Sequence, residues 1–244
     1  MKNIIRILSI AVLIPMVSCS QIDFNKIGKT INKDLNGING KKPLSNDEII
    51  AGLKEALKVG SNNAASSASK ADGYFKHPVI KIPFPPEAQQ MESSLRSIGM
   101  GKQVDEFIMT LNRAAEEAAK QAAPIFINAI TSMTITDGLS ILKGSDTAAT
   151  SYLKKTTSAQ LHEKFKPTIK DAIQKVDVTK YWNPLASTYN KIPFVTKVNP
   201  DLEEYITQRA LSGLFYLVSQ EETKIRQDPA ARVSDILKKV FGSK

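Results

Sequence analysis

Cysteine and histidine are both scarce in this 244-residue chain, which holds one cysteine, Cys19, and two histidines, His77 and His162. A single cysteine excludes internal disulfides, so packing alone must hold the folded domain. Neither histidine has a metal-binding partner at the spacing of one helical turn, and no second cysteine is present as a ligand. We therefore expect no metal site and no cofactor.

Recognisable catalytic motifs are also missing. The chain contains no nucleophile elbow, no phosphate-binding glycine loop and no dinucleotide fingerprint. A Ser-His-Asp triad would need a histidine placed by the fold. The simpler interpretations are structural: His77 precedes Pro78 in a connector, and His162 lies near a helix end, where its charge complements the helix dipole. The sequence predicts no catalytic residue.

Long apolar runs are absent except at the N-terminus. Residues 7–16 are apolar but too short to span a bilayer as a helix. They follow two basic residues and precede the small Ser18 and Cys19, an arrangement that resembles a bacterial lipoprotein signal. Met16 stands where such signals usually have leucine, and an ordinary cleaved secretory signal is the alternative. We expect residues 1–18 to be a signal peptide and Cys19 to attach the chain to a membrane through a lipid.

Acidic residues are outnumbered, giving a formal net charge of +9. The lysines are spread along the whole chain, which is typical of a solvated basic surface. Attraction to anionic lipid headgroups, lipopolysaccharide or cell-wall polymer is the alternative. Aromatic residues do not interleave with the basic ones, and an exported chain rarely meets nucleic acid, so we expect no nucleic-acid partner.

Composition changes near residue 44. Residues 19–43, which follow the predicted signal, are rich in asparagine, lysine and glycine, and we interpret them as the lipidated cysteine and a flexible tether. Ser45 and Glu48 then have the spacing of a capping box, which predicts the start of a helix. Residues 44–244 are long enough for one domain with a core of its own.

Helical periodicity without strand–helix alternation predicts an all-α domain of about eight helices. Two proline-bearing segments, 72–86 and 191–200, are expected to be extended connectors. Pro124 is expected to kink a helix, and Pro167 to begin one. The predicted helices span about residues 45–71, 87–98, 102–130, 136–142, 146–165, 167–176, 179–189, 200–227 and 229–241.

The two connectors share the tetrapeptide Lys-Ile-Pro-Phe, at residues 81–84 and 191–194. If the two segments lie side by side, they can form a small ribbon with each proline at an edge. The alternative is coincidence, with similar loop packing at both places.

Polar residues on apolar helix faces are the remaining candidates for a site. One interpretation is a polar pocket. The other is a structural latch, a set of caps and salt bridges that fixes the packing of the last helix. The residues concerned are Asn112, Glu116, Asp137, Glu222, Arg226 and Arg232.

Several short phrases, taken in order, resemble the bacterial domain of unknown function family 4197. They are NRAAE at 112–116, MTITDG at 133–138, TAATSY at 147–152, EETKIR at 221–226 and DPAAR at 228–232. The resemblance covers about residues 45–244 and implies an exported, helical protein. The family has no established activity, so no catalytic residue can be carried over.

These observations favour an envelope lipoprotein with a non-enzymatic binding or scaffold role facing the periplasm. Residues Ser20 and Gln21 after the cysteine differ from an aspartate-type retention signal, which favours the outer membrane. Large aromatic residues near the connectors point to an apolar ligand or an envelope protein as partner; they are Phe84, Phe194, Trp182 and Tyr181. The alternative is a hydrolase-like enzyme that uses helix-borne carboxylates.

Overall fold

A computed structural model describes residues 45–175, 178–195, 197 and 201–228. The chain divides into two units, Met1–Pro43 and Leu44–Lys244, and every described residue belongs to the second. The predicted signal peptide, Cys19, the tether and the last predicted helix with Arg232 lie outside the described residues. Within them the structure has helices and no strand, which confirms the prediction of an all-α fold.

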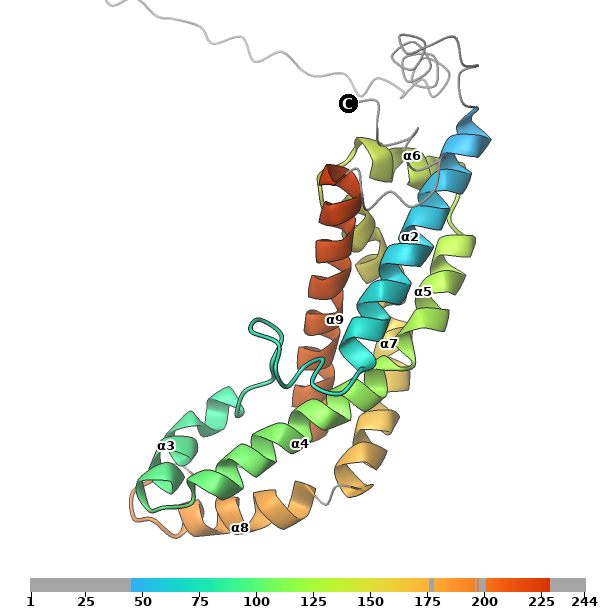
Figure 1. Cartoon of the computed structure of the whole chain (residues 1–244). Coiled ribbons are helices and arrows are strands. Elements are labelled where there is room, and N and C mark those ends of the chain that lie inside the picture. Colours follow the sequence, from blue (N-terminus) through green and yellow to red (C-terminus); the bar gives the residue numbers. More distant parts are fainter. Residues whose placement is uncertain (1–44, 176–177, 196, 198–200, 229–244) are drawn as a thin grey trace, which may run out of the picture. The chain divides into compact units, whose positions relative to one another are not determined.

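The helices form two neighbouring groups within this unit (Figure 1). In the first, α2, α5, α7 and α9 pack side by side, with the short α6 against α2 and α7. In the second, α3 and α8 pack on α4, which also contacts α2, α7 and α9. The elements are α2 (Asn46–Ser69), the 3-10 turn η1 (Pro86–Ala88), α3 (Gln89–Ser97), α4 (Gly101–Ala119), α5 (Ala122–Thr131), α6 (Ile135–Lys143), α7 (Ala148–Lys175), α8 (Val178–Asn190) and α9 (Leu202–Gln227).

The predicted capping box at the start of α2 is present. The hydroxyl of Ser45 accepts the amide of Glu48 at 3.2 Å, and the carboxylate of Glu48 accepts the amide of Ser45 at 2.8 Å. Two amides that a helix start leaves without partners are thus satisfied reciprocally. The cap places the apolar positions of α2, among them Ile49 and Leu53, in the core.

The prediction for Pro167 was wrong, and the prediction for Pro124 located the disturbance of the helix but described a break as a kink. The helix expected to kink at Pro124 instead ends at Ala119 and restarts at Ala122, so the proline lies in the first turn of α5, where its missing N–H breaks no helical bond. Pro167 begins no helix but lies inside the continuous α7. Pro167 lies on the solvent-exposed face of α7, and the opposite, buried face of α7 packs in the core and stabilises the continuous helix.

An aromatic cluster joins the first connector to the second group of helices. The rings of Phe84 and Phe107 lie 5.1 Å apart, and Trp182 lies 5.9 Å from the first and 5.1 Å from the second. All three side chains are buried. Phe84 and Trp182 therefore stabilise the core and are not exposed to an apolar ligand.

The two Lys-Ile-Pro-Phe segments have different structures. In the first, Ile82 and Phe84 are fully buried. In the second, Phe194 is fully exposed and has a left-handed backbone with a φ of 66°. No ribbon joins the two segments within the described residues. The match reflects composition and not equivalent packing.

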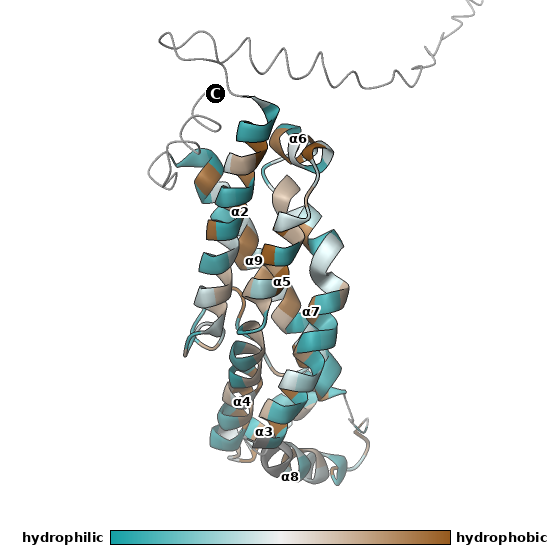
Figure 2. Cartoon of the chain, turned by 90° about the vertical axis from the view of Figure 1, so that its right-hand side faces the viewer, coloured by the Kyte–Doolittle hydropathy of each residue, from teal (hydrophilic) through white to brown (hydrophobic). Residues whose placement is uncertain are grey.

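Hydropathy follows the packing of the helices: the outward face of α7 is mostly hydrophilic (Figure 2).

Among the described residues no single helix is both long and apolar enough to cross a membrane. In the same part of the chain, one pair of helices bent by 105°, Gly101–Thr131 with Ile135–Lys143, reaches that length and apolar character when taken together.

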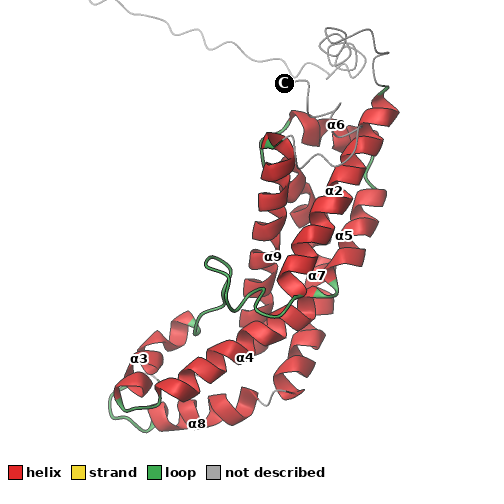
Figure 3. Cartoon of the chain, viewed as in Figure 1, coloured by secondary structure: helices red, strands yellow, loops and turns green. Residues whose placement is uncertain are grey.

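The segment between α2 and α3 is the feature that positions the candidate site. It leaves the end of α2, passes α9 and α4 without helical structure of its own except η1, and appears as the long loop in Figure 3. We call residues 70–85 the α2–α3 connector. Without a ladder or helix, its buried amides need partners from elsewhere in the fold.

Candidate functional site

Asn112 on α4 supplies partners to the α2–α3 connector. Its Oδ1 accepts the amide of Ile82 at 2.8 Å, and its Nδ2 donates to the carbonyl of the same residue at 2.8 Å. A further bond from Nδ2 reaches the carbonyl of Ile108, also at 2.8 Å. Asn112 is fully buried, so this side chain satisfies both backbone groups of Ile82, as a neighbouring strand would.

Glu116, one turn later, holds the beginning of the connector. Its Oε1 accepts the amides of Tyr74 and Phe75, each at 3.1 Å, and its Oε2 accepts from Arg113 at 2.6 Å. Arg113 also donates to Asp72 at 2.6 Å. Both carboxylate oxygens of this nearly buried residue thus carry structural bonds.

Asp137 has a capping role. Its carboxylate accepts the amide and the hydroxyl of Thr134 at 3.0 and 2.7 Å, and its own amide donates to that hydroxyl at 3.1 Å. The bonds from the Thr134 hydroxyl and amide lower the pKa of the Asp137 carboxyl. The residue therefore begins α6 with a second capping box.

Glu222 and Arg226 join three helices. The carboxylate of Glu222 on α9 accepts the amides of Ala149 and Thr150 at 2.9 and 2.8 Å, in the first turn of α7. Arg226 donates to Glu222 at 2.8 Å and to the carbonyl of Ile141 in α6 at 3.0 Å. The adjoining cavity is about 10 Å³, which leaves no room for a substrate.

The structure thus places these residues in separate groups. Asn112 and Glu116 lie together against the α2–α3 connector, Glu222 lies with Arg226 between α6, α7 and α9, and Asp137 begins α6. No hydrogen bond joins one group to another within the described part of the chain. Each carboxylate accepts from backbone amides, and such bonds fix geometry.

His162 belongs to a surface network between α7 and α9. Its Nε2 lies 3.0 Å from the carboxylate of Glu204, which also accepts from Lys166 at 2.9 Å and Gln208 at 2.7 Å. These bonds, that of Gln208 first, lower the pKa of Glu204 to about 2. Because the network is partly exposed, its contribution to stability is small.

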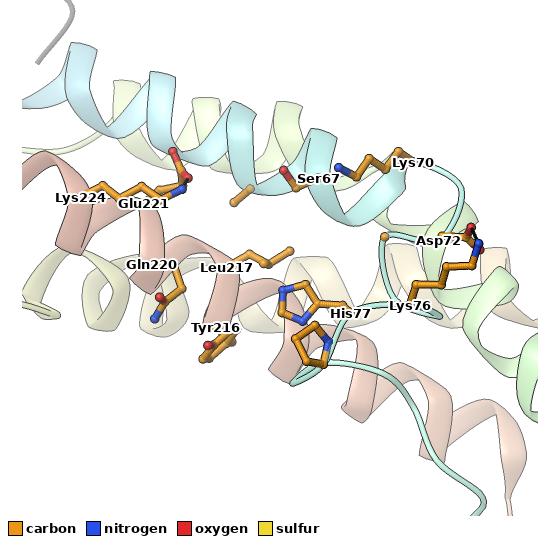
Figure 4. A pocket seen from close by; sticks show the side chains of 13 residues that line it. Ser67, Lys70, Asp72, Lys76, His77, Tyr216, Leu217, Gln220, Glu221 and Lys224 are labelled. Atoms are coloured by element: carbon orange, nitrogen blue, oxygen red, sulfur yellow. Dashed lines mark hydrogen bonds and ion pairs between the residues drawn. The ribbon is translucent and has the colours of Figure 1, made fainter. Parts of the chain in front are cut away.

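A groove of about 460 Å³ opens between the end of α2, the α2–α3 connector and α9. We call it the α2–α9 groove, and its volume lies in the range of small-molecule sites, about 300–1,000 Å³. Figure 4 shows side chains from all three elements around it. They include Ser67, Lys70, Asp72, His77, Tyr216 and Glu221.

The carboxylates in the groove are already bound. Glu221 accepts from Asn63 at 2.9 Å and from Lys224 at 2.5 Å. Asp72 accepts from Lys76 at 2.8 Å and from Arg113, and these bonds lower its pKa. No such partner lies within reach of the ammonium of Lys70 among the described residues.

The turn after α2 brings Lys70 and the start of the connector to the same groove. Asp72 has a left-handed backbone, with a φ of 67°, which is uncommon outside glycine. At the next residue, Gly73, an added Cβ would lie 2.3 Å from the carbonyl oxygen of Ser67. The chain therefore reverses too tightly for a larger residue at this point.

A second cavity of about 520 Å³ lies near α4 and α7. Its charged side chains largely pair with one another, as Arg113 does with Glu116 and Lys120 with Glu117 at 2.6 Å each. It therefore offers fewer unused polar groups than the α2–α9 groove.

Sequence reasoning missed the α2–α9 groove because its walls are about 140 residues apart in the chain. One signal for it exists on α9, where Tyr216, Gln220 and Lys224 recur every four residues and therefore share one helix face. On the other wall, Lys70, Lys76 and His77 crowd around the turn.

Within the residues that the structure describes, no three His, Cys, Asp or Glu side chains gather to hold a metal ion. A family model described as "Protein of unknown function (DUF4197)" matches residues 43–242. Neither the curated proteins nor the solved structures contain a match to the chain.

Proposed function

The chain belongs to the DUF4197 family, and from this premise we propose that it is a non-enzymatic binding protein of the bacterial cell envelope. In this proposal a lipid on Cys19 holds the protein at the outer membrane, facing the periplasm. The domain that begins at residue 44 then captures a small ligand in the α2–α9 groove.

The observation that supports the binding role is that the acidic groups of the groove have hydrogen-bond partners in the chain, whereas Lys70 has none among the described residues. Its carboxylates are taken by neighbouring side chains, while Lys70 keeps its hydrogen-bonding capacity for a ligand. Small-molecule sites typically combine such a few convergent polar groups with a concave surface. Leu217 and Ala64 supply apolar wall to the same groove.

The alternative, a hydrolase-like enzyme using Glu116, Asp137 and Arg226, receives no support from the geometry. A general acid or base must reach the proton that it transfers. Here both carboxylates hold backbone amides, and Arg226 spans Glu222 and the end of α6. The three residues contribute to three different structural contacts.

A scaffold role is favoured by one separate observation. Phe194, between α8 and α9, is fully exposed and has a φ of 66°. A large apolar side chain held outward by an unfavourable backbone conformation is suited to insertion into a protein partner. This surface is independent of the groove, so one protein can use both.

Filling the groove provides the test of the binding role. Ser67→Trp places a large ring on the groove wall, whereas Ser66→Trp adds the same ring to the exposed residue beside it. We expect native mass spectrometry of the full-length chain, purified from its own envelope in neutral detergent, to detect a bound small molecule. The Ser67 variant should lose that molecule and the Ser66 variant should keep it. Equal loading of the two variants would contradict binding in the groove.

The anchor is tested independently. Because Cys19 is the only thiol, Cys19→Ser is expected to abolish incorporation of a fatty-acid probe and to release the protein from the membrane fraction. Ser20→Ala, at the neighbouring position, serves as the control and should incorporate the probe normally. Undiminished labelling of the Cys19 variant would rule out this attachment.

A further inference from the structure

The α2–α9 groove has more donors than acceptors to offer a ligand. Both of its carboxylates are committed: Asp72 to Lys76 and Arg113, Glu221 to Asn63 and Lys224. Figure 4 shows Lys76 beside Asp72 and Lys224 beside Glu221, with Lys70 apart from both pairs. A ligand in the groove therefore meets an uncompensated ammonium group but no uncompensated carboxylate.

His77 adds a second donor of fixed orientation. Its Nδ1 accepts the amides of Val79 and Ile80 at 3.1 and 3.3 Å. A neutral imidazole that accepts at Nδ1 must carry its proton on Nε2. The ring also meets Tyr216 edge to face, with centroids 6.1 Å apart and an interplanar angle of 80°. These contacts hold the ring so that it offers a ligand an N–H donor.

The donors belong to different elements of the groove. Lys70 follows α2, His77 lies in the α2–α3 connector, and Tyr216 on α9 carries a hydroxyl with no hydrogen bond to the described chain. A tetrahedral anion has several oxygens that can accept from separate directions at once. The cation that lacks an acceptor is a lysine, whose compact charge suits phosphate without demanding a planar, two-pronged partner.

We propose that the α2–α9 groove binds an anionic ligand through a phosphate group, with Lys70 and the Nε2–H of His77 as donors. This inference rests on the proposed function and names the ligand class of that same groove. The apolar wall formed by Ala64 and Leu217 then receives an uncharged part of the ligand. Free phosphate esters and phospholipid headgroups share this chemistry.

Titration calorimetry of the full-length chain in neutral detergent micelles tests the inference. The probes are glycerol 3-phosphate, glycerol, inorganic phosphate and mixed micelles containing phosphatidylglycerol. The variants are Lys70→Glu, Lys70→Ala and, as a matched charge control, Lys154→Glu, which alters an exposed lysine of α7 outside the groove. Because the ammonium of Lys70 is exposed and makes no bond to the described chain, the variants should melt like the wild type.

We expect glycerol 3-phosphate to bind and glycerol not to bind. Lys70→Glu should weaken the binding of the phosphate ester at least about tenfold, and Lys70→Ala should weaken it by less. Lys154→Glu should change the dissociation constant by less than about twofold. Tighter binding of the phosphatidylglycerol micelles would identify a headgroup as the source, and tighter binding of the soluble probes a free phosphate. Both results support the inference.

Two results would overturn it. Equal weakening by Lys70→Glu and Lys154→Glu would mean that net charge, and not the groove, attracts the anion. Failure of every phosphate-bearing probe to bind would refute the ligand class. In that case, loss of the co-purified molecule from Ser67→Trp would still uphold the proposed binding function, while its retention would refute both.

Discussion

Replacing Glu222 with alanine is expected to lower the free energy of unfolding by about 3–5 kcal/mol, the usual effect of removing one partner of a buried ion pair. The side chains of Glu222 and Arg226 are only 5% and 7% exposed. The carboxylate also accepts the amides of Ala149 and Thr150. Its removal takes away the carboxylate that pairs with Arg226 at 2.8 Å and leaves the first turn of α7 without its cap.

Two further variants separate these contributions. Glu222→Gln keeps one acceptor and the size of the side chain but loses the charge, so an intermediate destabilisation is expected. Glu221→Ala removes the neighbouring carboxylate, whose partners Asn63 and Lys224 lie at the surface, with Lys224 60% exposed, and should cost less than about 1 kcal/mol. Urea denaturation followed by circular dichroism measures all three. Equal urea midpoints for Glu222→Ala and Glu221→Ala would show that the contacts of Glu222 and Arg226 between α6, α7 and α9 do not stabilise the domain as expected.

Asn112→Ala should destabilise the domain by about 2–4 kcal/mol. The substitution leaves the buried N–H and C=O of Ile82 without their partner, and each such group costs about 1–3 kcal/mol. The connector should loosen first, because its described residues, 70–85, form no helix or strand of their own. Trp182, the only tryptophan in the chain, contacts Phe84 of the connector and reports this event.

For the Asn112 variant, the urea unfolding curve measured by tryptophan fluorescence should therefore differ from the curve measured by circular dichroism. The fluorescence should change at a lower urea concentration. Thr110→Val is the control on the same helix, because Thr110 is buried but bonds only to Phe107 within its own turn. Its curves by the two methods should coincide. Coincident curves for Asn112→Ala as well would mean that the connector and the helices unfold as one unit, contrary to this account.

Local features could be predicted from the sequence. The capping box at Ser45 and Glu48 and the long helix that ends at Gln227 depend on residues close together in the chain, and the structure has both. The prediction for Pro167 failed because a proline signals a helix start only when no tertiary contact supports a continuous helix. The buried Phe165 and Ile169 provide that support in α7.

Long-range partners could not be predicted in the same way. The spacing of Asn112 and Glu116 placed both near one apolar face, but their acceptors and donors lie 30 and 42 residues upstream. The sequence showed that these residues needed partners without showing which ones. The α2–α9 groove has the same origin, since a turn after α2 meets a polar face of α9 only in the folded chain.

The hydrogen bonds from α4 to the connector affect how the sequences of related proteins can diverge. Asn112 and Glu116 bind main-chain groups of residues 74, 75 and 82, so these bonds do not depend on the exposed side chains of Lys76 and Pro78. Substitutions there can change the groove wall while the connector keeps its path. Selection can thus alter what the groove recognises separately from what keeps the domain folded.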